Sequence, residues 1–107
     1  MNSFNQKVII IDNSDLSYDG NDLDGVNIRG TETSLILLAE QFIKMKIEVD
    51  YCNSINKLSI VNGVRYYNKE NIDKNIFYDL AIVISDANEF RRVHSKKKQF
   101  FQIVINQ

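Results

Sequence analysis

The sequence lacks the features that mark several classes of protein. Its single cysteine, Cys52, excludes an internal disulfide and a zinc site built from cysteines. No apolar run exceeds five residues, as in Leu35–Ala39, whereas a membrane-spanning helix needs about 20. The N-terminus lacks the basic start and long apolar stretch of a secretory signal peptide. We therefore expect a cytoplasmic protein.

The chain also lacks a strong net charge. Its 13 basic and 14 acidic side chains give a net charge of −1, which disfavours a general nucleic-acid binder. The charges are unevenly placed, because residues 1–50 carry 4 basic and 9 acidic side chains and residues 51–107 carry 9 and 5. The basic excess includes Lys96, Lys97 and Lys98, which we interpret as solvating the end of a helix. Three lysines fall short of the about 4–8 that indicate lipid binding, so contact with a membrane surface has weak support.

The hydrophobic pattern predicts one α/β domain over residues 1–107. Apolar, β-branched runs predict strands that are buried on both faces, and the helical spacing of apolar residues after Thr31 predicts a helix. An alternating segment predicts a strand nearer a sheet edge, and Asn62-Gly63 predicts a turn before a short strand. The predicted buried strands are 7–12, 80–85 and 100–105, the edge strand is 47–52, the short strand is 64–67, and the weakly helical segment is 89–98. This order is typical of a Rossmann-like, mostly parallel sheet flanked by helices.

A long loop, residues 13–30, separates the first strand from the helix. It holds Gly20, Gly25 and Gly30, and loops above about 12–15 residues are usually functional or disordered. A glycine at a helix N-terminus lets the backbone approach an anion, which the free N–H groups bind. The alternative is that Gly30 only turns the chain into the helix. The spacing fits neither the dinucleotide-binding fingerprint nor a Walker loop.

Several short segments together are similar to one enzyme family. They are Lys7–Asp12, Arg29–Leu35 (R-G-T-E-T-S-L), Leu38-Ala39, Glu48-Val49 and Asn62–Tyr66 (N-G-V-R-Y). In this order they resemble the N-terminal domain of family 4 glycosyltransferases of the GT-B fold. The resemblance implies an enzyme that transfers a sugar from a nucleotide-sugar donor to a sugar, lipid or protein acceptor. The nucleotide-sugar is then a substrate, and we expect no cofactor and no metal.

The resemblance also implies where substrates bind. Arg29, Gly30 and Thr31 would lie beside the donor diphosphate. Ser85 and Asp86, past the carboxyl end of a central strand, are candidates to face the acceptor, although loop geometry explains them equally well. Asn106 is a third candidate to face the acceptor, because it stands where the family has a histidine near the reaction centre. No catalytic residue is assigned.

The sequence departs from the family pattern at two further points. Arg29 replaces the first glycine of a pair, and Lys46-Ile47 stands where the family often has Gly-His. The family's C-terminal domain, which in those enzymes supplies most donor contacts, has no counterpart within these 107 residues. We therefore expect an acceptor-side domain that is inactive by itself and acts with a donor-binding domain.

Two other functions remain open. One is a non-catalytic α/β interaction or regulatory module. The other is a receiver-like phosphotransfer domain, since Asp12 and Asp86 both follow apolar strands, but no lysine ends the last strand. A calcium loop that starts at Asp15 fails because Val26 stands where a bidentate glutamate is needed. The lone histidine, His94, is expected at the surface and Cys52 in the core.

Overall fold

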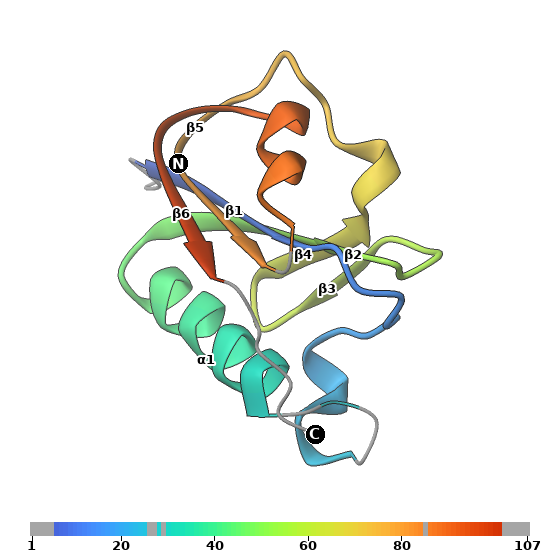
Figure 1. Ribbon diagram of the computed structural model, residues 1–107. Helices are drawn as coiled ribbons and strands as arrows, with labels where there is room; N and C mark the ends of the chain where they lie inside the picture. The colour runs from blue at the N-terminus through green and yellow to red at the C-terminus, as the bar shows by residue number, and fades with distance from the viewer. Residues whose placement is uncertain (1–5, 26–27, 29, 85, 102–107) are drawn as a thin grey trace.

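The computed structural model describes residues 6–25, 28, 30–84 and 86–101, which form an α/β sandwich around one six-stranded sheet (Figure 1). The strands lie in the order β3-β4-β2-β1-β5-β6, and all neighbours are parallel except the β3–β4 hairpin. The Rossmann-like fold class is thereby confirmed. The strands are β1 (Gln6–Asp12), β2 (Ile47–Asn53), β3 (Ser59–Val61), β4 (Val64–Asn68), β5 (Phe77–Ile84) and β6 (His94–Phe101). The helix is α1 (Gly30–Lys44), and the short 3-10 helices are η1 (Gly20–Asp24), η2 (Lys69–Asn71) and η3 (Ala87–Arg92).

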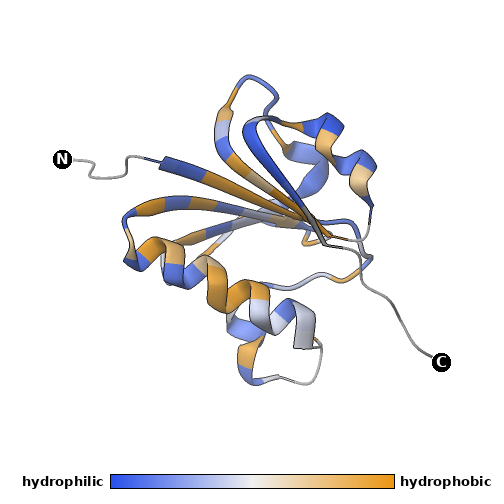
Figure 2. Cartoon of the chain, turned by 60° about the vertical axis from the view of Figure 1, so that its left-hand side comes forward, coloured by the Kyte–Doolittle hydropathy of each residue, from blue (hydrophilic) through white to orange (hydrophobic). Residues whose placement is uncertain are grey.

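The central strand β1 is buried on both faces. Val8 and Ile10 belong to the core on the α1 side of the sheet, whereas Ile9 and Ile11 belong to the core on the opposite side. That opposite side is covered by η2, η3 and their connections (Figures 1 and 2). Because both faces need apolar side chains, this strand reads as a continuous hydrophobic run, as does most of β5.

The prediction that residues 47–52 lie nearer a sheet edge is wrong, because β2 lies between β4 and β1. The polar residue that produced the alternation, Asp50, is 1% exposed. Its Oδ2 accepts hydrogen bonds from the Tyr78 hydroxyl at 2.6 Å and the Tyr67 hydroxyl at 2.9 Å. Arg65 Nη1 lies 3.7 Å from Oδ1. Tyrosines of β4, next to β2, and of β5, on the far side of β1, thus supply the donors that let a carboxylate occupy an inner strand.

The structure also corrects the prediction for the last part of the chain. Residues 89–98 were predicted to be weakly helical, but the 3-10 helix there is Ala87–Arg92. The strand β6 begins at His94, earlier than the predicted strand 100–105. Lys96, Lys97 and Lys98 therefore lie on an edge strand instead of at a helix end, and all three are exposed. Charged side chains on an edge strand oppose pairing with another chain. Residues 102–105 lie outside the described residues.

The turn predicted at Asn62-Gly63 is confirmed, and it joins β3 to β4. Both residues have positive φ, 52° and 88°, in keeping with a tight hairpin turn. A Cβ on Gly63 would lie 2.9 Å from Ile43 Cγ2 on α1, which already packs against the hairpin. This glycine is therefore required both by its backbone conformation and by the space available.

Gly63→Ala is expected to lower the free energy of unfolding by about 1–2 kcal/mol, because alanine is strained at positive φ. Gly30→Ala is the matched control, since a Cβ there meets no atom within 4 Å in the described part of the chain beyond its neighbours and its own helix. Its effect should stay within about 0.5 kcal/mol. Urea unfolding followed by circular dichroism measures both. Equal midpoints for the two variants would contradict this role of Gly63.

Candidate functional site

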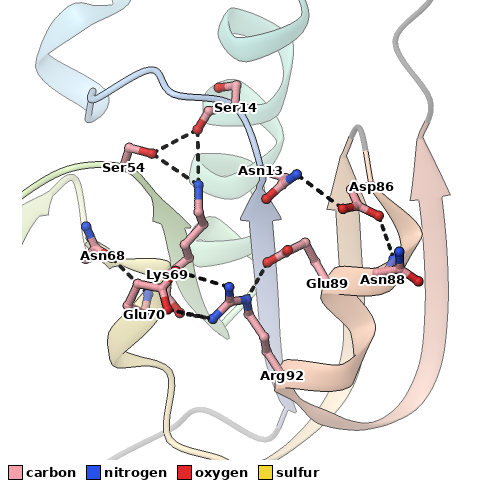
Figure 3. Close-up of polar contacts among 10 residues, drawn as sticks. All are labelled: Asn13, Ser14, Ser54, Asn68, Lys69, Glu70, Asp86, Asn88, Glu89 and Arg92. Atoms are coloured by element: carbon pink, nitrogen blue, oxygen red, sulfur yellow. Dashed lines mark hydrogen bonds and ion pairs between the residues drawn. The ribbon is translucent and has the colours of Figure 1, made fainter.

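The carboxyl ends of four parallel strands meet at one edge of the sheet. Each of β1, β2, β4 and β5 is followed within two residues by a polar side chain, namely Asn13, Ser54, Lys69 and Asp86 (Figure 3). The chain leaves β1 for β2 on one side, and β5 pairs with β1 on the other side, so the strand order reverses at β1. In open α/β sheets, ligands bind in the crevice outside this reversal point. We refer to these four residues and the side chains that contact them as the carboxyl-edge cluster.

Lys69 contributes a cation to the cluster. Its Nζ donates to the Ser14 carbonyl oxygen at 3.2 Å and to Ser54 Oγ at 3.1 Å. Ser54 Oγ in turn donates to the Ser14 carbonyl oxygen at 2.9 Å. The ammonium group therefore joins the segments that follow β1, β2 and β4.

Arg92 links the segments that follow β4 and β5. Its two terminal nitrogens contact the two carboxylate oxygens of Glu70, each at 3.2 Å, and its Nε donates to Glu89. This fork geometry is the strong form of an arginine–carboxylate pair. Burial opposes the charge of Arg92, but the hydrogen bonds with Glu70 and Glu89 outweigh it and raise the pKa of Arg92. The same hydrogen bonds lower the pKa of Glu70.

Asp86, a predicted acceptor-facing residue, lies in this cluster. Its Oδ2 is 3.4 Å from the Asn13 side-chain nitrogen, and its Oδ1 accepts the Asn88 backbone N–H at 2.9 Å. The second contact caps the N-terminus of η3, so Asp86 also has a local structural role. The Asp86 carboxylate and the Asn13 amide are half-buried beside the reversal point. The carboxylate can accept a hydrogen bond from a polar ligand, and the amide can donate one to it.

The other predicted site residues are placed less fully. Gly30 is the exposed first residue of α1, and Thr31 follows it half-buried. Between described residues, no hydrogen bond or ion pair joins either of them to Asp86. The remaining predicted site residues, Arg29, Ser85 and Asn106, lie outside the described residues. Sequence reasoning missed Lys69 and Arg92, because both stand in polar segments without a recognisable motif.

A buried network holds the start of the long loop beneath this edge. The Asp12 carboxylate is fully buried; one oxygen accepts the Tyr18 hydroxyl at 2.6 Å and the other accepts the Ser14 N–H at 2.8 Å. The Tyr18 and Tyr51 hydroxyls are 2.8 Å apart, and burial is the main cause that raises the pKa of both. Asp12 is therefore a structural anchor, enclosed where an acceptor of a phosphoryl group needs access.

The acidic loop is ordered by its own hydrogen bonds. Asp19 caps η1 by accepting the Asn21 N–H, and its other oxygen accepts the Ser59 hydroxyl at 2.6 Å. In the part of the chain that the structure describes, no three His, Cys, Asp or Glu side chains gather as metal ligands would. Within that same part, no helix has the length and apolarity needed to cross a membrane.

The chain matches no protein-family model, no curated protein and no solved structure.

Proposed function

We propose that this chain is the acceptor-side domain of a GT-B glycosyltransferase. Joined to a donor-binding domain, it transfers a sugar from a nucleotide-sugar to a sugar, lipid or protein acceptor. The observation that carries the proposal is the reversal of strand order at β1, with the Asn13–Asp86 pair directly outside it. Such a reversal is where α/β domains of this class bind their ligands.

The residues divide the work by chemistry. Asp86 and Asn13 offer a hydrogen-bond acceptor and a donor to the hydroxyl groups of an acceptor. The first N–H groups of α1, at Gly30 and Thr31, face the donor diphosphate, because free N–H groups and the helix dipole attract anions. Catalysis by this domain is then mainly positioning of the acceptor against the departing diphosphate.

The β3–β4 hairpin supports the proposal independently of the edge. The segment N-G-V-R-Y was one of the pieces that resembled the family, where a strand follows the glycine. Here Asn62-Gly63 forms the turn, and β4 starts at Val64 and pairs parallel to β2. A local sequence match and a local structure therefore coincide at the same residues.

Gly30→Val tests the diphosphate role without disturbing the fold. Among the described residues, apart from its chain neighbours and the backbone of α1, a Cβ at Gly30 meets no atom within 4 Å, so a larger side chain there is expected to be tolerated by the fold. We expect uridine, guanosine or adenosine diphosphate, added in turn to the isotope-labelled chain, to shift the amide resonances of Gly30 and Thr31. The valine variant should bind the same nucleotide about tenfold more weakly or worse, a loss of about 1.4 kcal/mol.

Gly30→Ala is the graded control, and its affinity for the nucleotide should lie between that of the unchanged chain and that of the valine variant. The proposed role is contradicted if none of the three nucleotides shifts these resonances at millimolar concentration. It is equally contradicted if the valine variant binds as tightly as the unchanged chain. Unchanged circular dichroism of the variant shows that a loss of binding is not a loss of folding.

A further inference from the structure

A groove runs beside α1 on its own face of the sheet. The helix packs mainly over β2 and β4, and the groove lies over β1, β5 and β6. Its volume is about 260 Å³. Val8 and Leu80 form its floor, Phe42 and Ile47 line the α1 side, and Lys96 and Lys97 line the β6 side.

The α1 side of the groove continues as an apolar stripe along the helix. Leu38 and Phe42 are four residues apart on α1, and Met45 follows the last residue of the helix, three residues after Phe42, so the three lie toward one side of the helix. Leu38 is 36% exposed and Met45 is 58% exposed. The opposite flank of α1 faces the hairpin, where Glu40 accepts a hydrogen bond from Asn62 at 3.0 Å. The exposed stripe therefore lies on the flank that faces the groove.

The β6 side is basic and is fixed by strand register. Val8 pairs with Leu80, and Leu80 pairs with Lys97, so the three stand in one row across the sheet. Lys96 and Lys97, which line the groove, are both exposed, whereas Lys98 pairs with Ala81, which belongs to the core on the opposite side of the sheet. The strand β6 is hydrophilic along most of its length (Figure 2). The one carboxylate in the groove, Asp79, already accepts the Lys7 backbone N–H at 2.8 Å.

We propose that this groove docks an amphipathic α-helix of a partner protein, with an apolar stripe and an acidic flank. The position beside α1 is the one that a second helix takes in a doubly wound α/β layer, about 8–10 Å from the first. The apolar stripe of the partner packs against Leu38, Phe42 and Leu80. Its carboxylates meet the lysines of β6, which select the partner by charge. A helix needs no backbone partner, so it fits a groove floored by side chains.

The test is a selection from a displayed library of helical peptides in which apolar positions are fixed and flanking charges are randomised. The unchanged chain should enrich peptides with Asp and Glu on one flank. A Lys96→Glu, Lys97→Glu double variant should enrich Lys and Arg instead, because the charge of the groove wall is reversed. Leu38→Glu should weaken the selected peptides about tenfold or more, since it places a charge in the stripe.

Leu58→Glu is the matched control, because Leu58 is also an exposed leucine (58%) but belongs neither to the groove lining nor to the stripe on α1. It should leave peptide binding unchanged. The proposal is overturned if no helical peptide is enriched, or if the enriched flanking charges are the same for both proteins. It is also overturned if Leu38→Glu binds as well as Leu58→Glu. Binding to phosphatidylserine vesicles, sensitive to Leu38→Glu and unaccompanied by peptide binding, would assign the face to a membrane instead. None of these outcomes depends on nucleotide binding at Gly30.

Discussion

Above about pH 10 the protein is expected to lose stability steeply, because every one of its five tyrosines resists ionisation in the folded state. Burial is the main cause that raises the pKa of each of them, at positions 18, 51, 66, 67 and 78. In the unfolded chain they lose their protons near the ordinary pKa of about 10. The unfolded state then binds fewer protons than the folded state, so stability falls as the pH rises.

The expected slope is large. Each tyrosine that ionises only in the unfolded chain removes at most about 1.4 kcal/mol of stability per pH unit, and this limit is reached only well above pH 10. Urea midpoints between pH 8 and pH 11, with tyrosinate absorbance recorded in parallel, measure the slope and the number of protons. A folded protein whose tyrosines titrate near pH 10 would contradict the prediction.

Tyr66→Phe isolates one tyrosine in that slope. Among the described residues the buried Tyr66 hydroxyl has no hydrogen-bond partner, so phenylalanine removes the ionisable group without breaking a bond. Stability near pH 8 should change little, while the alkaline slope should decrease by up to about 1.4 kcal/mol per pH unit. An unchanged slope would mean that Tyr66 titrates in the folded state as it does in the unfolded state.

Asp50→Ala is expected to destabilise the fold by about 3–5 kcal/mol, a large part of the stability of a domain of this size. The carboxylate is almost fully buried, accepts both the Tyr67 and the Tyr78 hydroxyl, and lies opposite Arg65. Alanine leaves these donors without their acceptor in the interior and adds a cavity. Chemical unfolding of the purified variant at neutral pH measures the loss.

Glu48→Ala is the matched control on the same strand. Glu48 forms an ion pair with Lys7 at 3.2 Å, but both side chains are partly exposed, at 25% and 32%. Exposed pairs contribute little, so this variant should lose less than about 1 kcal/mol. Similar losses for the two variants would show that strand propensity, and not the buried hydrogen bonds, sets the cost at Asp50.

Two of the three strands predicted from continuous apolar runs, 7–12 and 80–85, were located correctly because burial on both faces leaves a strong local signal. The run that starts at Lys7 and the run that ends at Ile84 lie in β1 and β5, the two inner strands at the reversal point. The hairpin turn was predictable because Asn and Gly tolerate positive φ. These signals are contained in a few adjacent residues.

The position of β2 and β6 in the sheet could not be read in the same way. An alternating pattern normally means one solvated face, but Asp50 is buried because tyrosines from β4 and β5 reach it. Tyr67 and Tyr78 are 17 and 28 residues away from Asp50 in sequence, and they reach it only because of the register between their strands. Likewise, three lysines predict a solvated segment equally well on a helix end and on an edge strand.

Of the candidate site, Asp86 was predictable because it directly follows an apolar strand. Its contact with Asn13 was not predictable, because the two residues are 73 positions apart in sequence. Lys69 and Arg92 are functional candidates only because η2 and η3 bring them to the same edge. A single side chain in a polar loop carries no signal of that kind.

The central place of β1 has a consequence for synthesis of the chain. Its two neighbours in the sheet are β2 and β5, and β5 ends 72 residues after β1 ends. At about 5–20 residues per second, a ribosome completes β5 several seconds after β1 has been made. During that interval α1, β2 and β4 can pack on one side of β1, while its other edge has no native neighbour. Distant pairings of this kind slow folding, so the newly made N-terminal half is the stage at which this protein most needs a chaperone.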